Sequence, residues 1–402
     1  MIHYFNPGHE TAVVNASPYY MAPANVVLMQ RQLAYLPAWY AAPEDVVFVW
    51  EVDEAFHSCL RENLRPIASP IGATSLPDYA AEDVCLWGIS PQAIHFWEEL
   101  KAAYELDIHL PQWREEYRYL NSRQSAQEVL SLLCGQIAAI EDTILPVFTS
   151  SLDEVESMVE QSTIQLLAKA PYSSSGRGLL WLPVGELTRT ERQILHGIIK
   201  KQQVVSIEQA LDKQVDFAME FLSDGKGKVS FAGYSLFYAS SKGAYEGNYL
   251  GSQKKIAAYL SSYLSAELLE RVQKELALIL SDKYALYEGC IGVDMMLYKS
   301  GGEYRLHPCV EINMRYNMGY LAMCFSRNYL HPQSEGAFYL DYNAGEGSIM
   351  QKHNELQTTR PAIIEDGRLK SGYLPLCPVR DDSHYWAYVL VTADGGEIPH
   401  KR

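Results

Sequence analysis

The feature that most constrains the fold is a loop of small residues with an apolar run on each side. The loop, Lys169-Ala-Pro-Tyr-Ser-Ser-Ser-Gly-Arg-Gly178, follows the run at 164–169 and precedes another at 179–182. Small residues let backbone amides approach phosphate oxygens, and a nearby cation completes such a site. A Walker A loop would instead carry Gly-Lys-Ser/Thr and open a helix, so this loop is predicted to join two strands. The alternative is an exposed hairpin with a solvated lysine.

Length and composition limit the class of protein. At 402 residues the chain is too long for one compact core, so two or three domains are expected. No apolar run approaches the roughly 20 residues that span a bilayer, and the N-terminus lacks a signal peptide pattern. Seven scattered cysteines without a C-x-x-C pair favour reduced thiols, and therefore a cytoplasmic location. The net charge of −16 disfavours nucleic-acid binding.

Residues 1–120 are predicted to form an α/β domain. Short apolar runs at 2–5 and 46–50 have strand length, while 26–36 and 91–104 have helical spacing. Buried strands that alternate with helices indicate an α/β layer. The turn Asn6-Pro7-Gly8-His9-Glu10 follows the first strand, where such sheets bind ligands, and it either contacts a substrate or caps a helix.

Helix starts mark the middle of the chain. Asn121 or Ser122 begins one helix, and the pairs Ser151-x-x-Glu154 and Thr188-x-x-Glu191 predict two capping boxes. Tyr245–Gly251 is predicted to be a polar loop that faces an acceptor substrate. Residues 331–402 contain several glycines and prolines and no long periodic segment.

A second constellation lies on a predicted β-hairpin whose turn is Ser300-Gly301-Gly302. Asp294 and Glu311 lie on its two strands, and Glu311, Asn313 and Arg315 alternate onto one face. Two carboxylates and an amide oxygen suit magnesium, and an arginine beside them can stabilise developing negative charge. The alternative is a solvent-facing polar stripe with a structural Glu–Arg pair.

The return strand of this hairpin contains an irregular stretch, Leu306-His307-Pro308-Cys309. Proline removes a ladder hydrogen bond, so a bulge or an edge position is predicted, and a slip in register would displace Asp294. We interpret His307 as a hydrogen-bonded histidine and Cys309 as a buried cysteine, rather than as catalytic groups.

Together the two constellations resemble the ATP-grasp superfamily over about residues 121–325, and the loop and the E-x-N-x-R motif look most like its biotin-carboxylase branch. Serines replace three glycines of the family loop. The resemblance implies α/β and α+β architecture, with a Rossmann-like pre-ATP-grasp unit followed by a two-subdomain ATP-grasp fold. The implied domains are 1–120, the pre-ATP-grasp domain; 121–206, the subdomain with the phosphate loop; 207–330, the subdomain with the metal site; and 331–402, an extension packed on the core.

The same resemblance implies that the chain binds ATP and Mg²⁺. Lys169 matches the strand lysine on the α/β phosphates, Arg123 a second cation, and Asp216 the acid that binds ribose hydroxyls. Lys169 and Arg315 are the implied catalytic residues. The implied phosphate loop is Ser173, Ser174, Ser175, Gly176, Arg177 and Gly178. The implied adenine hinge is Glu208, Gln209, Ala210 and Leu211. The implied magnesium ligands are Asp294, Glu311 and Asn313.

The reaction that the resemblance implies is an ATP-dependent ligation. A carboxylate becomes an acyl phosphate, an amine or thiol captures it, and ADP and phosphate leave, with catalysis by positioning and electrostatics. An ATP-grasp small-molecule kinase and an inactive nucleotide-binding protein are the alternatives. The expected partners are small-molecule carboxylate and amine substrates, with a homodimer left open and neither nucleic acid nor a membrane expected.

Overall fold

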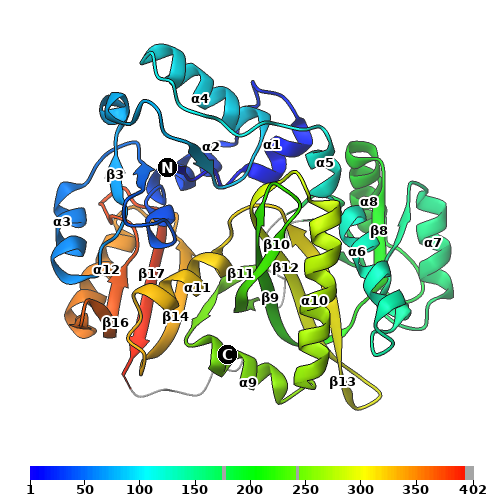
Figure 1. Ribbon diagram of the computed structural model, residues 1–402. Helices are drawn as coiled ribbons and strands as arrows, with labels where there is room; N and C mark the ends of the chain where they lie inside the picture. The colour runs from blue at the N-terminus through cyan, green and yellow to red at the C-terminus, as the bar shows by residue number, and fades with distance from the viewer. Residues whose placement is uncertain (174–177, 241–243, 394–402) are drawn as a thin grey trace.

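The computed structural model describes residues 1–173, 178–240 and 244–393, and it contains three β-sheets (Figure 1). The calls on Ser174, Ser175, Gly176 and Arg177 therefore lie outside the described residues. Among the described residues, no helix is both long and apolar enough to span a bilayer.

The first sheet is a parallel α/β layer, as the sequence predicts. Its order is β3-β2-β1-β4, and all of its strands are parallel. The chain adds β2 and β3 on one side of β1 and β4 on the other, so the strand order reverses at β1. In open α/β sheets ligands bind beyond the carboxyl ends of the strands at such a switch point, which here are the turns after β1 and β4. We call this region the crevice. The strands are β1 (Ile2–Tyr4), β2 (Val46–Phe48), β3 (Ser69–Ile71) and β4 (Val84–Leu86). The helices are α1 (His9–Asn15), α2 (Ala24–Gln32), η1 (Leu36–Trp39), α3 (Glu54–Asn63), η2 (Ala73–Tyr79), α4 (Pro91–Ala103) and α5 (Glu116–Leu120).

The second sheet is antiparallel, with the order β5-β8-β6-β7, and it carries the predicted phosphate loop. Lys169 on β6 pairs with Leu179 on β7, so the loop joins two strands as predicted. Thr188 forms a complete capping box, whereas Ser151 caps its helix and the Glu154 carboxylate bonds to Thr149 instead. The strands are β5 (Val147–Thr149), β6 (Leu166–Lys169), β7 (Leu179–Trp181) and β8 (Val205–Gln209). The helices are α6 (Arg123–Gln136), η3 (Asp142–Ile144), α7 (Leu152–Gln161) and α8 (Arg189–Gln202).

The third sheet is a nine-stranded antiparallel sheet with the order β13-β12-β9-β10-β11-β14-β17-β16-β15. The predicted loop at 245–251 is mostly strand β11, so that expectation is wrong: the backbone pairs with β10 and β14. The strands are β9 (Asp212–Asp224), β10 (Val229–Ala239), β11 (Tyr245–Leu250), β12 (Glu288–Ser300), β13 (Glu303–Asn313), β14 (Glu335–Tyr342), β15 (Ile363–Glu365), β16 (Arg368–Pro375) and β17 (Tyr385–Thr392). The helices are α9 (Gln253–Ser261), α10 (Ala266–Lys283), α11 (Met318–Asn328) and α12 (Ser348–Thr359).

The two ends of the chain share one hydrophobic core. Trp39 is buried against Phe325 and Tyr329, and its indole N–H donates to the Leu376 carbonyl at 2.8 Å. The same cluster includes residues from β2, α11, β14, β16 and β17. The sheet strands after residue 331 therefore pack directly against the N-terminal α/β layer (Figure 1).

Candidate active site

The predicted hairpin is present, and its register brings the predicted metal ligands together. Asp294 on β12 lies opposite Glu311 on β13, and directly opposed residues point to the same face of a sheet. The strand β13 is the edge of the sheet, and it carries a bulge between Glu311 and His307. Pro308 falls within this bulge, where its missing N–H costs no ladder hydrogen bond. The predicted bulge and edge position are thus confirmed.

One face of strands β9, β12 and β13 presents the predicted ribose and metal residues on consecutive rungs. The rungs, each read from β9 through β12 to β13, are Asp216, Met296 and His307; Ala218, Asp294 and Glu311; and Glu220, Gly292 and Asn313. Asp216 also accepts a hydrogen bond from Lys213 at 2.5 Å. This ladder gives the predicted site its order, with the ribose acid one rung from the carboxylate pair.

The electrostatics of Asp294 fit a divalent cation. Burial, and then the nearby charges of Glu311 and Glu220, raise the pKa of the Asp294 carboxyl well above its usual value. A cation between Asp294 and Glu311 would relieve that penalty. In the described part of the chain, no three His, Cys, Asp or Glu side chains form a metal cluster. Magnesium here would rest on two carboxylates and the Asn313 amide, and would need phosphate oxygens and water to complete six ligands.

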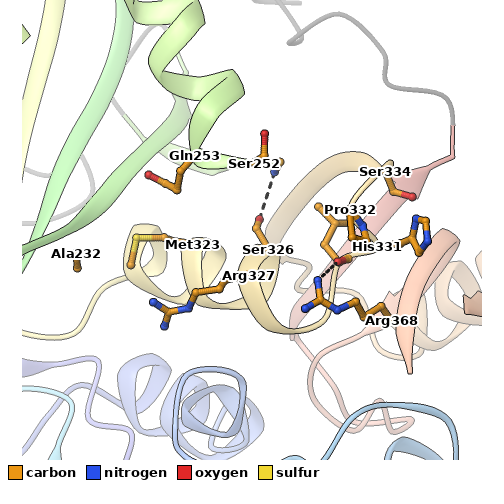
Figure 2. A pocket seen from close by; sticks show the side chains of 12 residues that line it. Ala232, Ser252, Gln253, Met323, Ser326, Arg327, His331, Pro332, Ser334 and Arg368 are labelled. Carbon is orange, nitrogen blue, oxygen red and sulfur yellow. Dashed lines mark hydrogen bonds between the residues drawn. The ribbon is translucent and has the colours of Figure 1, made fainter. Parts of the chain in front are cut away.

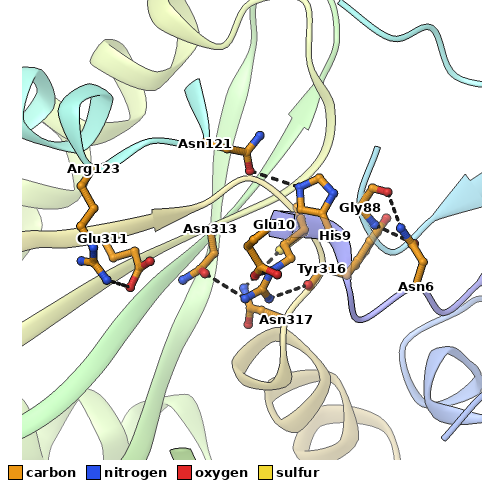
Figure 3. Close-up of polar contacts among 12 residues, drawn as sticks. Asn6, His9, Glu10, Gly88, Asn121, Arg123, Glu311, Asn313, Tyr316 and Asn317 are labelled. Atoms are coloured by element: carbon orange, nitrogen blue, oxygen red, sulfur yellow. Dashed lines mark hydrogen bonds and ion pairs between the residues drawn. The ribbon is translucent and has the colours of Figure 1, made fainter. Parts of the chain in front are cut away.

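Arg315 connects strand β13 to the N-terminal α/β layer, because it bonds to both Asn313 and Glu10. Figure 3 shows Asn313 and Glu10 at this contact. Its Nε donates to Glu10 at 2.6 Å, Nη2 to Asn313 at 3.0 Å and Nη1 to the Tyr316 carbonyl at 3.1 Å. Burial alone would raise the pKa of Glu10, but the charge and hydrogen bond of Arg315, together with His9 and a backbone hydrogen bond, lower that pKa overall. Three bonds in different directions hold the arginine beside the metal ligands.

The turn after β1 is fixed at the switch point of the first sheet. The Asn6 amide exchanges two hydrogen bonds with the Gly88 backbone, at 2.8 and 3.1 Å, and so joins the turns after β1 and β4. His9 bonds to Asn121 at 3.1 Å, and a side chain at Gly88 would lie 2.4 Å from the His9 ring. Burial lowers the pKa of His9 to about 4. No side chain of this turn caps α1, whose N-cap is Gly8, so its contacts bind other segments together (Figure 3).

Two predicted phosphate ligands are held in ion pairs. Lys169 is buried and pairs with Glu208 of the predicted adenine hinge. Arg123 pairs with Glu311 at 2.9 Å, and also lies 3.4 Å from the Ser173 hydroxyl (Figure 3). Both cations are thus paired with acidic side chains, Glu208 and Glu311, that are predicted to belong to the same nucleotide site. Phosphate binding would require these pairs to exchange partners.

The ends of the phosphate loop that the structure describes form a closed hairpin base. The Ala170 N–H donates to the Gly178 carbonyl at 2.9 Å. Gly178 has φ +85°, in the left-handed region, and a side chain there would lie 3.0 Å from Ser173. A glycine at this position lets the chain turn back into β7.

The predicted hinge is the crossing between the second and third sheets. Glu208 and Gln209 end β8, and the Ala210 N–H donates to the Gln165 carbonyl at 3.0 Å. Leu211 then packs against the core that supports β9. A cavity of about 10 Å³ remains between the sheets, lined partly by Arg123, Ser206, Glu208 and His307. It holds no more than one water molecule, so a nucleotide would have to separate the sheets.

His307 differs from its predicted role. The side chain is 3% exposed, yet its Nδ1 has no hydrogen-bond partner among the described residues. The interpretation of a fully hydrogen-bonded histidine is therefore wrong, because the β13 bulge places the ring against the small cavity between the sheets. Burial lowers the pKa of His307 to about 4, so the ring is neutral. Cys309 is buried, as expected.

Sequence reasoning missed Glu220. This carboxylate is 1% exposed, and it accepts hydrogen bonds from Ser235 at 3.0 Å and Asn317 at 2.8 Å. Burial raises its pKa to about 7. A side chain at Gly319 would lie 2.4 Å from its Oε1, so this glycine is needed for the carboxylate to fit. Its alternation with Asp216 along β9 was the available signal.

Comparisons with known proteins identify the fold. No protein-family model and no curated protein matches the sequence. The structure is similar to biotin carboxylase from Campylobacter jejuni in its β,γ-ATP complex, with a TM-score of 0.53 and 12% identity over 98% of this chain and 88% of that chain. The chain therefore has the ATP-grasp fold, as the motifs imply.

Other solved structures are similar at lower scores. The biotin carboxylase domain of Hydrogenobacter thermophilus 2-oxoglutarate carboxylase, crystallised as a dimer with MgADP and bicarbonate, has a TM-score of 0.49 and 10% identity over 97% of this chain and 85% of that chain. N5-carboxyaminoimidazole synthetase from Staphylococcus aureus, in complex with ADP, has a TM-score of 0.47 and 11% identity over 98% of this chain and 93% of that chain.

Proposed function

We propose that this chain is an ATP-dependent ligase that activates a carboxylate as an acyl phosphate for attack by an amine or a thiol. The observation that carries the proposal is the juxtaposition of Asp294, Glu311 and Asn313 with Arg315, at the crevice of the first sheet. The ATP-grasp fold supports it, and so do the nucleotide complexes of the solved neighbours.

The nucleotide would bind between the second and third sheets. Lys169 and Arg123 would leave Glu208 and Glu311 and bind the phosphates, because both cations already lie where the second and third sheets meet. We call this region the junction. The backbone of 208–211 would contact adenine, and Asp216 the ribose hydroxyls. Loop residues 173–178 would cover the phosphates with amides and hydroxyls. Magnesium, held by Asp294, Glu311 and Asn313, would supply charge neutralisation on the phosphate oxygens.

The carboxylate substrate would enter from the crevice at the turns after β1 and β4, where Arg315 lies. Its oxygen attacks the γ-phosphorus, a new O–P bond forms, and the bond to the bridging oxygen breaks with its electron pair leaving on ADP. The amine then attacks the acyl carbon, phosphate leaves, and the amine proton passes to solvent. Arg315 stabilises the negative charge that develops in both steps, because Glu10 and Asn313 fix its orientation. Exclusion of water protects the acyl phosphate from hydrolysis.

The test is a screen of small carboxylates, each with and without amines and thiols, for stimulated release of ADP. A ligase produces ADP and free phosphate, and the mass of the product equals both substrates less one water. A product that keeps the phosphate would identify the kinase alternative. ATP binding without turnover on any acceptor would identify an inactive nucleotide-binding protein. Lys169→Met is the matched control, and it must lose the stimulated release.

A further inference from the structure

A second cavity, of about 290 Å³, lies away from the junction of the sheets (Figure 2). It is bounded by the start of α9, the end of α11 and the segment that leads into β14. None of its lining residues also lines the small cavity beside Lys169 and Arg123. The two cavities are therefore separate candidate sites.

The walls of this pocket carry positive charge without acidic partners. Arg327 and Arg368 form no ion pair with any residue in the described ranges 1–173, 178–240 and 244–393. The Arg327 guanidinium lies 3.4 Å from the Cys324 sulfur, and Arg368 Nη1 donates to the Leu330 carbonyl at 3.1 Å. The Nε of Arg368 is buried and lacks a hydrogen-bond partner within those ranges.

Two carboxylates near the pocket each form an ion pair, although Glu335 Oε2 is buried without a partner among the described residues. Glu365 pairs with Lys370 at 2.5 Å and lies 3.5 Å from His331, and Glu335 pairs with Lys255. Burial, and then the charge of Arg65, lower the pKa of Arg368, which means that neighbouring groups oppose its charge instead of compensating it. An anion in the pocket would supply the missing compensation.

The rest of the lining is apolar or rigid. Met323, Leu330 and Pro332 contribute apolar surface. Gln253 is held on both sides by the Tyr234 backbone, at 2.7 and 2.8 Å, so it forms a fixed wall. The N-terminus of α9, whose cap is Ser252, adds the positive end of a helix dipole. Figure 2 shows Arg327 and Arg368 on either side of the end of α11, with His331 beside Arg368.

We propose that this pocket binds a small organic anion, a carboxylate or phosphate group joined to a compact apolar body. The Arg368 guanidinium, whose Nε has no partner among the described residues, would bind the anionic group, and Pro332 would contact the apolar part. Arg327, on the other side of the end of α11, would add long-range attraction. The volume lies at the small end of ligand pockets, which excludes a whole nucleotide. The inference does not depend on the proposed ligase activity.

The test is calorimetric titration of the full chain, without nucleotide, with benzoate and separately with phenyl phosphate. Wild type is expected to bind at least one probe at a single site, and the tighter probe identifies a carboxylic acid or a phosphate ester. Arg368→Lys is expected to weaken binding about tenfold, because it removes a charge-assisted contact. Arg327→Gln is expected to weaken binding by a smaller factor, because it removes a positive charge near the pocket. The exposed Arg189→Gln on α8 is the matched control, and it should bind like wild type.

Lys169→Met separates this pocket from the candidate active site, which also contains cations. Retention of binding in Lys169→Met, with weaker binding in Arg368→Lys and in Arg327→Gln, supports the proposal. Absence of binding of both probes up to about 10 mM would overturn it. Binding that Lys169→Met weakens and the two arginine variants leave unchanged would also overturn it. Circular dichroism spectra must show that each variant is folded, and Arg327→Gln, at an exposed position, serves if Arg368→Lys does not fold.

Discussion

The two cationic regions of the candidate active site are held in different ways. At the junction of the sheets, Lys169 and Arg123 each pair with a carboxylate that is itself a predicted ligand, Glu208 or Glu311. At the crevice, Arg315 is bound by Glu10, Asn313 and a backbone carbonyl. The first arrangement must change when phosphate arrives, whereas the second can stay as it is. We infer that the junction adapts to the nucleotide and the crevice is preorganised for the transferred group.

The largest expected effect is at the junction. Lys169→Met is predicted to lower ADP release at least about 10³-fold, because one cation on the phosphates is lost. The measurement is steady-state turnover with the substrates found by the screen. Since the change leaves Glu208 partly buried and without Lys169, the double variant Lys169→Met/Glu208→Gln provides the folded control. Wild-type turnover in either variant would remove Lys169 from the site.

The crevice is tested by Arg315→Lys, which keeps the charge and loses the fixed guanidinium geometry. Turnover is predicted to fall about 10²-fold with little change in the KM for ATP, because the nucleotide contacts lie at the other region. Glu10→Gln is predicted to lower kcat in the same direction by a smaller factor. A rise in the KM for ATP without loss of kcat would show that Arg315 binds the nucleotide and does not stabilise the transferred group.

The loss of stability in acid can be compared for one buried histidine from each region, His9 at the crevice and His307 at the junction. The pKa values of His9 and His307 are lowered to about 4, so both rings stay neutral in the folded state while the unfolded chain binds protons below about 6.5. The free energy of unfolding should therefore fall as pH drops from 6.5 toward 4. At pH 5 each histidine should cost about 2 kcal/mol. Urea unfolding of wild type and His307→Phe at pH 7 and pH 5 should show a smaller loss in the variant.

The smallest expected effect concerns the nucleotide affinity of His307→Phe. The substitution removes a buried nitrogen without a described partner, so stability at pH 7 should be unchanged or higher. If Nδ1 meets the bound nucleotide, the ADP affinity should fall about fivefold. Calorimetry with MgADP measures this, and His57→Gln, in α3, is the control. Equal ADP affinity in wild type and His307→Phe would leave the ring a role in packing alone.

Local patterns predicted the hairpin and the strand-to-strand loop because turn chemistry and alternation are short-range signals. Asp294 and Glu311 were paired correctly from the glycine turn and the period of two. The Glu10–Arg315 contact spans 305 residues, and no local pattern reports it. Glu220 was missed because a carboxylate on a strand is usually exposed, and its burial depends on the small residue Gly319.

The strands after residue 331 escaped prediction for a different reason. Strand β15 is three residues long, and β14 and β16 include glycines that weaken a strand pattern. Their stability comes from pairing with β17 and β11 and from the core shared with the N-terminal layer. Such support is tertiary, so a single sequence does not display it.

The shared core also sets an order for biosynthesis. Trp39 leaves the ribosome long before Phe325, Tyr329 and the Leu376 carbonyl that cover it. The N-terminal layer therefore cannot complete its packing during translation until nearly the whole chain has emerged, although domains generally fold as they are made. Contacts of such long sequence separation slow folding. A nascent chain that ends before residue 325 would lack all of these contacts, and its exposed tryptophan would be available to a chaperone.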